Sequence, residues 1–195
     1  MSGLEPTRVR GLLVSPALTW IRKTWGDPFL AAVLARLPEE TRGQFDRLLL
    51  PLAEIPVSDW QDFLDACHAE LRAKGGGRPD AFDRAMIHEG GPGVVQTFFK
   101  SVLGTLGPAA VVGRMGFVHA RGFAPSVVEV VENTEGRARI RYRHHASSHA
   151  HVKRYVPLLV SELLAQAGAK DIRAVVAKDS LDDGTSLVEL DLAYQ

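Results

Sequence analysis

The chain has 195 residues, of which 46% are hydrophobic and 24% are charged, a composition typical of a folded globular protein rather than a disordered one. Its 23 lysines and arginines balance its 23 aspartates and glutamates, so binding to nucleic acid through bulk positive charge is not expected. The single cysteine, Cys67, excludes an internal disulfide and a cysteine-only zinc site, and it indicates a reducing compartment. Because no apolar leader and no apolar stretch of about 20 residues is found, we expect a cytoplasmic protein without a membrane span.

Residues 1–120 have mainly helical patterns. The apolar run Arg8–Val14 predicts a short strand. Asp27 and Pro28 predict a helix start, because aspartate caps the first turn and proline has no N–H to leave unpaired there. Apolar residues at helical spacing continue until Pro38, and another apolar stripe covers residues 45–52.

Further helices are expected between residues 58 and 119. Ser58 and Gln61 have the spacing of a capping box, and the helix that they begin is expected to end at Gly75–Gly77. A second helical block begins at Pro79, and the dense apolar residues of Val94–Leu106 predict a helix buried on more than one side. Pro108–His119 is predicted as one more helix.

After Pro125 the apolar period changes to two. Strands are expected at Ser126–Glu132 and Arg137–His144, and again at Ile172–Ala177 and Thr185–Leu192, each pair being joined by a hairpin turn. A helix over residues 148–166 separates the two hairpins. We therefore predict a single α+β domain, residues 1–195, whose helical part (about 1–120) packs on an antiparallel sheet of four to five strands (about 125–195).

Several segments carry a family resemblance that extends over nearly the whole chain. They are Val9–Ser15, Ile55–Trp60, Gly168–Ile172 and Asp182–Leu190. The pattern resembles a paralogous family of unknown function found in myxobacteria, which is compared with the four-vinyl-reductase domain and the haem–nitric-oxide-binding fold. The resemblance implies a helical layer over an antiparallel sheet, an apolar pocket, and sensing or scaffolding rather than catalysis.

The chain departs from both relatives at residues that bind metals. Four-vinyl-reductase-like domains often carry cysteines near the last hairpin, where this chain has Ser186. The haem-binding branch uses a histidine ligand and a Tyr-x-Ser-x-Arg signature, whereas the nearest match here is Arg141-Tyr142-Arg143. We therefore predict no cofactor and no metal.

Four alternating arginines are the most unusual local feature. Arg137, Arg139, Arg141 and Arg143 would all point to one face of a strand. Guanidinium groups suit an anionic partner such as an acidic protein or a nucleotide, but a solvated strand face is the alternative, and nucleic acid is a third, unlikely one. A turn of two or four residues would align Glu132 with the arginines, and a turn of three would align Glu129.

Four histidines lie within eight residues, at His144, His145, His149 and His151. Such a group could bind zinc, but the spacing does not suit one regular element, so a polar junction between strand and helix is the competing interpretation.

An apolar set is the third candidate site: Phe98, Phe99, Met115, Phe117 and Phe123. It could line a ligand pocket, belong to the core, or form a dimer face.

No nucleophile elbow and no phosphate loop is present, and Cys67 lies among apolar residues at helical spacing, which favours a core position over a catalytic thiol. We therefore predict a non-enzymatic sensory or regulatory domain that binds a small apolar ligand, a protein partner, or both. The alternative is a homodimeric interaction scaffold without a pocket, and a haem or metal sensor is a third possibility. We expect a homodimer in either of the first two cases.

Overall fold

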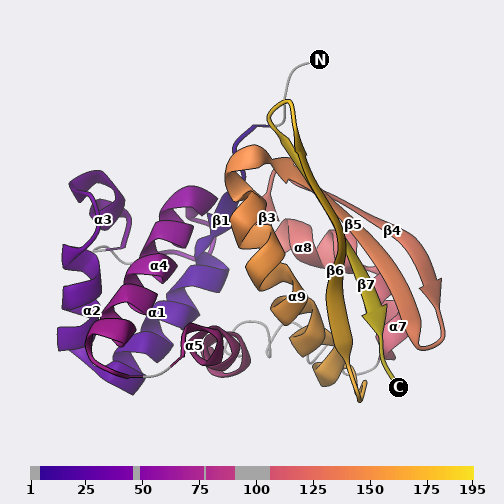
Figure 1. The fold of residues 1–195 in the computed structure, drawn as a ribbon, viewed down its shortest axis with the longest axis horizontal. Helices are drawn as coiled ribbons and strands as arrows, with labels where there is room; N and C mark the ends of the chain where they lie inside the picture. The colour runs from indigo at the N-terminus through magenta and orange to yellow at the C-terminus, as the bar shows by residue number, and fades with distance from the viewer. Residues whose placement is uncertain (1–4, 46–48, 77, 91–105) are drawn as a thin grey trace. The chain divides into compact units, whose positions relative to one another are not determined.

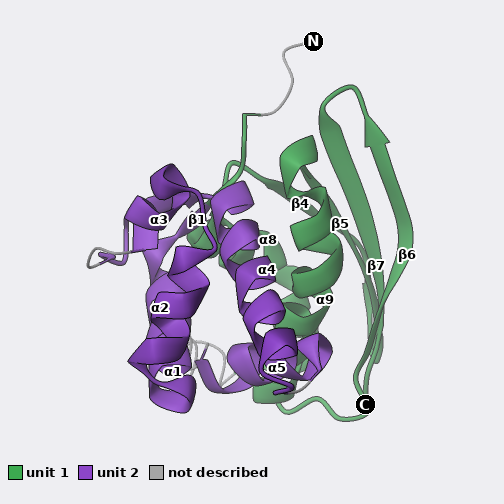
Figure 2. Cartoon of the chain, turned by 60° about the vertical axis from the view of Figure 1, so that its left-hand side comes forward, with its two compact units in different colours: residues 1–8, 95–195 green, residues 9–94 purple. Residues whose placement is uncertain are grey.

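The computed structural model describes residues 5–45, 49–76, 78–90 and 106–195. The chain forms two compact units (Figure 2). Unit 1 comprises residues 1–8 and 95–195, and unit 2 comprises residues 9–94. The predicted helix over Val94–Leu106, which includes Phe98 and Phe99, lies almost entirely outside the described residues.

The strand at the start of unit 2, whose first residue is still assigned to unit 1, is shorter than expected. Strand β1 covers only Arg8–Arg10, and the rest of the predicted strand is the first turn of α1 (Gly11–Trp25). The helix forms because buried residues recur every three to four positions, at Val14, Ala17 and Ile21. Gly11 is required at the start, since a Cβ there would lie 2.1 Å from the carbonyl oxygen of Leu50.

The next helices of unit 2 follow the predicted pattern with three corrections. Asp27 is the first residue of its helix and does not cap it, since Gly26 holds the N-cap position without a side-chain hydrogen bond. The apolar stripe expected over residues 45–52 is helical only at Phe45 among the residues described there, and the capping box is the third correction.

Helices α2 (Asp27–Ala35) and α3 (Glu39–Phe45) precede the short strand β2 (Glu54–Pro56) and the long helix α4 (Val57–Ala73). The capping box does not form: α4 already begins at Val57, so Ser58 lies inside the helix and its hydroxyl donates to Asp59. Cys67 is fully buried in α4, and burial raises the pKa of its thiol, as a core role requires.

The last part of unit 2 is α5 (Pro79–Ala85) followed by a π-helical turn, η1 (Met86–Gly90). Trp20, Trp25 and Phe82 are in mutual ring contact, with centroids 4.9–5.7 Å apart. The Trp20 indole donates to Glu89 over 3.0 Å. Aromatic packing therefore holds η1 and α5 against α1.

Unit 1 is built on a four-stranded antiparallel sheet in the order β4-β5-β7-β6 (Figure 1). The strands are β4 (Val127–Thr134), β5 (Arg137–His145), β6 (Arg173–Asp182) and β7 (Thr185–Ala193). Both hairpins turn in two residues, and Gly136 (φ 75°) supplies the left-handed conformation that the first turn requires. Both predicted hairpins are confirmed, but β4 and β6 run longer than expected.

Three helices of unit 1 pack on one face of this sheet. Helix α9 (His149–Gln166) crosses β6 and β7, while α7 (Pro108–Gly113) and α8 (Met115–Gly122) lie against β4 (Figure 1). The single helix predicted over Pro108–His119 is two helices, because Arg114 interrupts the helical conformation between them. Pro157 lies inside a continuous α9, which begins eight residues before it.

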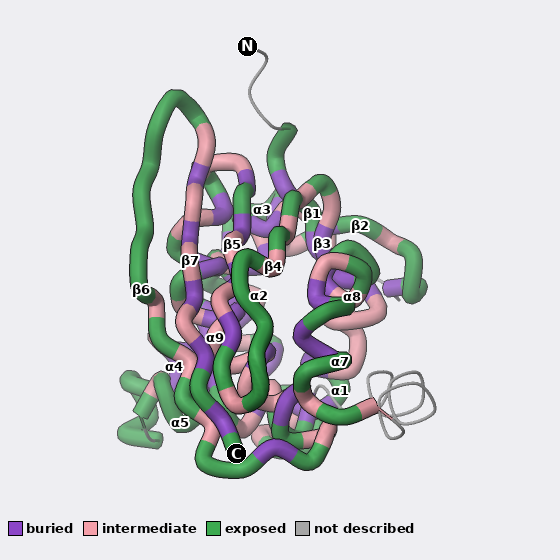
Figure 3. The backbone as a smooth tube through the Cα atoms, turned by 90° about the vertical axis from the view of Figure 1, so that its right-hand side faces the viewer, coloured by how far each residue is buried: buried purple, intermediate pink, exposed green. Residues whose placement is uncertain are grey.

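Burial along the inner strands alternates, as the tube in Figure 3 shows for β5 and β7. The face toward the helices carries residues such as Ile140, Tyr142 and Leu190, and the other face is exposed or half-exposed. The chain therefore has the predicted α+β class, with helices in its N-terminal part and an antiparallel sheet in its C-terminal part. Among the described helices, none is long and apolar enough to cross a membrane.

Candidate functional site

A cluster of histidine and tyrosine rings is buried inside unit 1. His119 comes from α8, and Tyr142 and His144 come from the covered face of β5. The His119 ring centroid lies 5.2 Å from that of Tyr142 and 5.3 Å from that of His144. Phe123 stacks on His119 at 4.8 Å. We call His119, Phe123, Tyr142 and His144 the interior cluster.

Four buried polar atoms of the interior cluster lack hydrogen bonds to the residues that the structure describes. They are Nε2 of His119, the hydroxyl of Tyr142 and both ring nitrogens of His144. Each of these residues is at most 4% exposed, so bulk water does not reach them. The hydroxyl of Ser148, after β5, is buried without a partner as well. Such atoms normally find partners, because leaving one unpaired costs about 1–3 kcal/mol.

Burial keeps these groups neutral. It lowers the pKa of His144 to about 4 and, together with the charges that His144 and His151 would carry, lowers the pKa of His119 well below its ordinary value. Burial also raises the pKa of the Tyr142 hydroxyl. The interior cluster at neutral pH therefore offers hydrogen-bond donors and acceptors without charge.

The four clustered histidines of the sequence are placed in different surroundings. His144 belongs to the interior cluster, and His151 is buried on α9, 5.7 Å from Phe123. Nδ1 of His149 is hydrogen-bonded to the Ser186 hydroxyl, and Nε2 of His149 lies 3.3 Å from a carboxylate oxygen of Asp179. Nδ1 of His145 is hydrogen-bonded to the Ser147 hydroxyl. Residues 144–151 therefore form a junction between β5 and α9, which is the second of the two interpretations of the four histidines. No group of three or more potential metal ligands is found within the described ranges.

The structure separates the predicted apolar set. Met115 and Phe123 are buried in the core of unit 1, and Phe123 borders the interior cluster. Phe117 is 53% exposed, because it lies on the outer side of α8, where the Arg121 guanidinium covers its ring. Phe98 and Phe99 are outside the described residues. Phe117 is therefore not placed to line an interior pocket.

The four alternating arginines point away from the interior cluster, to the uncovered face of β5. Arg139 donates to Asp191 over 2.7 Å, and Arg141 bonds Glu189 over 3.0 Å, so both are held by β7. These carboxylates raise the pKa values of Arg139 and Arg141. Arg137 and Arg143 are exposed at the two ends of the row.

Both of the acids considered for the hairpin face the arginines. A β-bulge between Val130 and Glu132 shifts the register of β4 by one residue, so Glu132 lies opposite Arg139 and Glu129 lies opposite Arg141. Without the bulge, alternation would have put only one of them on this face. The turn length alone could therefore not decide between the two.

Sequence reasoning missed His119, which lies 23 residues before Tyr142 and 25 residues before His144 in the chain. Tyr142 was not singled out as a site residue, although the alternation along its predicted strand placed it, with His144, on the face opposite the arginines. The usable signal was alternation along β5: the residues between the arginines, Tyr142 and His144 among them, had to point to the covered face. A polar ring on a covered face requires a partner or a guest.

The chain belongs to the family described as protein of unknown function (DUF2378), whose model matches residues 7–189. No match is found among curated proteins.

Solved structures with a similar fold are H-NOX domains. A variant of the Cs H-NOX protein with 4-cyano-L-phenylalanine has a TM-score of 0.70 at 15% identity, covering 95% of this chain and 96% of that one. The Fe(II) unliganded H-NOX protein from K. algicida gives 0.68 at 14% identity, covering 95% and 96%. An oxygen-binding H-NOX domain related to soluble guanylate cyclases gives 0.65 at 14% identity, covering 95% of each chain. At this identity the likeness establishes an H-NOX-like fold.

The interior cluster does not fit a haem. A haem ligand must turn a free ring nitrogen toward a flat macrocycle, but the His119 and His144 rings are in contact with each other and with Tyr142. Arg141 and Arg143 point to the opposite face of β5 from Tyr142, so they cannot join it at one ligand. No Tyr-x-Ser-x-Arg segment occurs anywhere in the sequence. We assign no haem to these residues.

Proposed function

We propose that this member of the DUF2378 family is a non-enzymatic regulatory domain that binds a small, mainly apolar molecule inside unit 1. The observation that carries the proposal is the interior cluster, where buried atoms of His119, Tyr142 and His144 lack hydrogen-bond partners among the described residues. The H-NOX-like fold supports it, because solved structures of this fold include an oxygen-binding domain.

The chemistry of the interior cluster selects the kind of guest. The rings of Phe123, Tyr142 and the two imidazoles now contact each other, so they would have to move apart to admit a small apolar body. The ring nitrogens and the hydroxyl would then bind one polar group on it. Because the low pKa values keep both imidazoles neutral, a neutral guest is favoured over an anion. We therefore expect a compound with an apolar skeleton and a hydroxyl, carbonyl or amide group.

Strand β5 connects this site to an exposed surface to which a partner protein could bind. Tyr142 and His144 face the interior, while the neighbouring Arg141 and Arg143 face outward on the same strand. Helix α8 could pack against the sheet in two ways. A ligand that binds one of these arrangements more tightly than the other increases the population of that arrangement. Any resulting displacement of β5 also moves its outward arginines, so ligand binding would alter the outer face.

The test is native mass spectrometry of the purified full chain, with two matched variants. Tyr142→Phe removes the hydroxyl of the interior cluster, and Tyr194→Phe removes another buried hydroxyl without a described partner, at the far end of the sheet. We expect a bound compound in the wild type and in Tyr194→Phe, and a reduced occupancy in Tyr142→Phe. A protein that carries no compound, and whose melting temperature no member of a neutral apolar panel shifts, would overturn the proposal.

A homodimeric scaffold is the second candidate function. It is favoured by apolar side chains exposed on the two edge strands, namely Val127 and Val131 on β4 and Val175 and Leu181 on β6. A specific dimer would bury about 1,000 Å² or more and would protect these edges. Sedimentation velocity separates the two cases, because a monomer at micromolar concentration would exclude this scaffold.

A further inference from the structure

The uncovered face of the sheet carries arginines of two kinds. Arg139 and Arg141 are occupied by carboxylates of β7. Arg137 makes no ion pair with any described residue, and neither does Arg173, the first residue of β6. Arg173 is 30 residues away from the sequence pattern that drew attention to the arginine row. Two guanidinium groups on this face therefore remain available for a ligand.

The strand register brings these two arginines to one place. Arg137 and Arg173 both lie opposite Ala193, one from each side. Residues directly opposite each other share a face, so Arg137, Ala193 and Arg173 form one row across three strands. Two strand spacings separate the outer members by about 10 Å. Because the residue between them is alanine, no side chain fills the gap between the two arginines.

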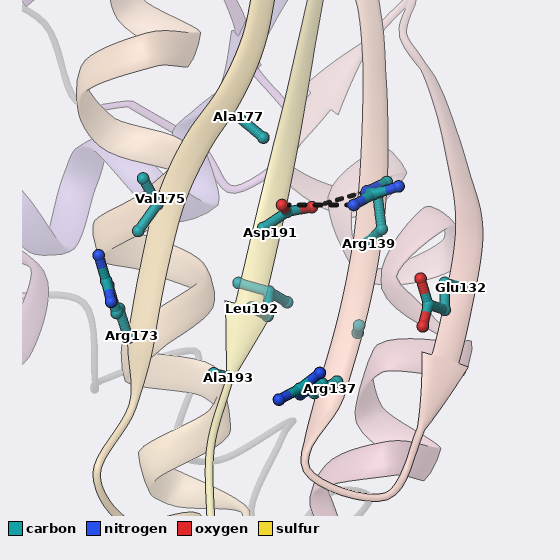
Figure 4. Close-up of a pocket in the computed structure, with 10 residues that line it drawn as sticks. Glu132, Arg137, Arg139, Arg173, Val175, Ala177, Asp191, Leu192 and Ala193 are labelled. Carbon is teal, nitrogen blue, oxygen red and sulfur yellow. Dashed lines mark hydrogen bonds and ion pairs between the residues drawn. The ribbon is translucent and has the colours of Figure 1, made fainter.

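The row lies at the end of a shallow hollow with a volume of about 450 Å³ (Figure 4). Arg137 and Arg173 line it on opposite sides, and Val175 and Ala177 of β6 form an apolar wall. Val175 is 41% exposed, so this wall is open to a partner.

The charges of the hollow favour an acidic guest. Three arginines line it against two acids, Glu132 and Asp191. Asp191 is already bonded to Arg139, so Glu132 is the remaining acid of the lining that can compete for the free guanidinium groups. Each guanidinium presents a planar fork of donors that matches a carboxylate.

We propose that Arg137 and Arg173 form a clamp for a carboxylate side chain of an extended acidic and apolar segment in a partner protein. The apolar wall distinguishes this occupant from a free anion, because phosphate would use the two arginines and leave Val175 and Ala177 uncovered. Strands β5, β6 and β7 are 9, 10 and 9 residues long, so their uncovered face has room for neighbouring side chains of an extended segment. The clamp goes beyond the proposed function and is independent of whether the interior cluster binds a ligand.

The test uses the full chain and a fluorescent, capped peptide of alternating valine and glutamate, measured by anisotropy. A peptide with glutamine in place of glutamate is its uncharged control. We expect binding that weakens with salt, weakens by about tenfold or more in Arg137→Gln and in Arg173→Gln, and is nearly unchanged in Arg143→Gln. Arg143 is the matched control, since it is an exposed arginine on the same face of β5 at the other end of the row.

Two further variants sharpen the result. Glu132→Gln removes the competing acid and should tighten binding several-fold. Ala193→Glu places a carboxylate between the two arginines and should block the peptide more strongly than Ala193→Gln, which has the same size. Equal binding of the uncharged peptide, or an Arg143→Gln variant as weak as Arg137→Gln, would overturn the clamp. Competition by inorganic phosphate at equal strength would overturn the protein partner in favour of a small anion.

Discussion

The two units differ in whether a buried histidine has a hydrogen-bond partner. In unit 2, His68 is 2% exposed and its Nε2 lies 2.7 Å from a carboxylate oxygen of Asp83, which is 1% exposed. In unit 1, His144 is 1% exposed and neither ring nitrogen has a partner among the described residues. A buried polar ring with its own partner stabilises the fold, whereas one without a partner has capacity left for a guest. The contrast therefore favours a structural role for His68, and it supports the binding role that we propose for His144.

The largest effect is expected in unit 2, from breaking the His68–Asp83 pair. Asp83→Leu leaves His68 buried without its carboxylate, and should lower the free energy of unfolding by about 3–5 kcal/mol. Urea denaturation followed by circular dichroism measures this loss. Asp80→Asn on the same helix is the control, because Asp80 pairs with Arg78 at the surface and should change little. A small loss in Asp83→Leu would remove the structural role of the pair.

The next effect is a pH dependence that should come from unit 1. The pKa of His144 is about 4 in the folded chain, against about 6.5 when unfolded, so the unfolded state takes up the proton first as the pH falls. The stabilisation that the folded chain owes to neutral His144 is fully present above about pH 6.5. It is lost progressively as the pH falls to about 4, and the total loss in the free energy of unfolding is about 3 kcal/mol. Burial of His119 acts in the same direction. Urea denaturation at pH 7 and pH 4.5 checks this slope.

Two variants test whether the pH dependence of the unfolding free energy comes from the interior cluster. His144→Phe removes one titrating group and should make the pH dependence of the unfolding free energy shallower between pH 6.5 and 4, leaving the part due to His119. His145→Gln is the neighbouring control, because His145 is half-exposed and bonded to Ser147, and it should leave the slope as in the wild type. Equal slopes in His144→Phe and the wild type would show that His144 gains a proton, and with it a partner, without opening the fold.

Sequence patterns predicted the fold better than they predicted the site. The hairpins were predictable because alternating apolar residues and glycine turns act locally, as at Glu135 and Gly136. The strand expected at Arg8–Val14 was wrong beyond Arg10, because a seven-residue window is too short to show the helical period that continues to Ile21. Element types therefore followed from local periodicity wherever the window was long enough.

The site depends on contacts that no local pattern contains. His119 meets Tyr142 and His144 only through the packing of α8 on the sheet. Arg173 joins Arg137 only because β7 lies between their strands. The bulge in β4 could not be predicted from the sequence either, although it determines which acids face Arg139 and Arg141. Residues that were conspicuous in the sequence, such as the middle arginines, are those whose charges the fold already pairs.

A smaller effect is expected from the hydroxyl of Tyr142. Because this buried hydroxyl has no described partner, Tyr142→Phe should raise the free energy of unfolding of the ligand-free chain by about 1 kcal/mol. Tyr194→Phe should give a similar gain for the same reason, but without any effect on a bound compound. Urea denaturation of protein purified under conditions that strip small molecules measures both. A loss of stability in Tyr142→Phe would show that its hydroxyl is permanently bonded.

The smallest effect compares two buried serines of unit 1, both fully buried. The Ser186 hydroxyl is bonded to Nδ1 of His149 over 2.9 Å, whereas the Ser148 hydroxyl has no partner among the described residues. Ser186→Ala should therefore cost about 1 kcal/mol, and Ser148→Ala should be neutral or slightly stabilising. Thermal unfolding of the two variants beside the wild type measures the difference. Two equal losses would mean that Ser148 is bonded in solution, and the contrast between partnered and unpartnered buried groups would then no longer identify the binding site.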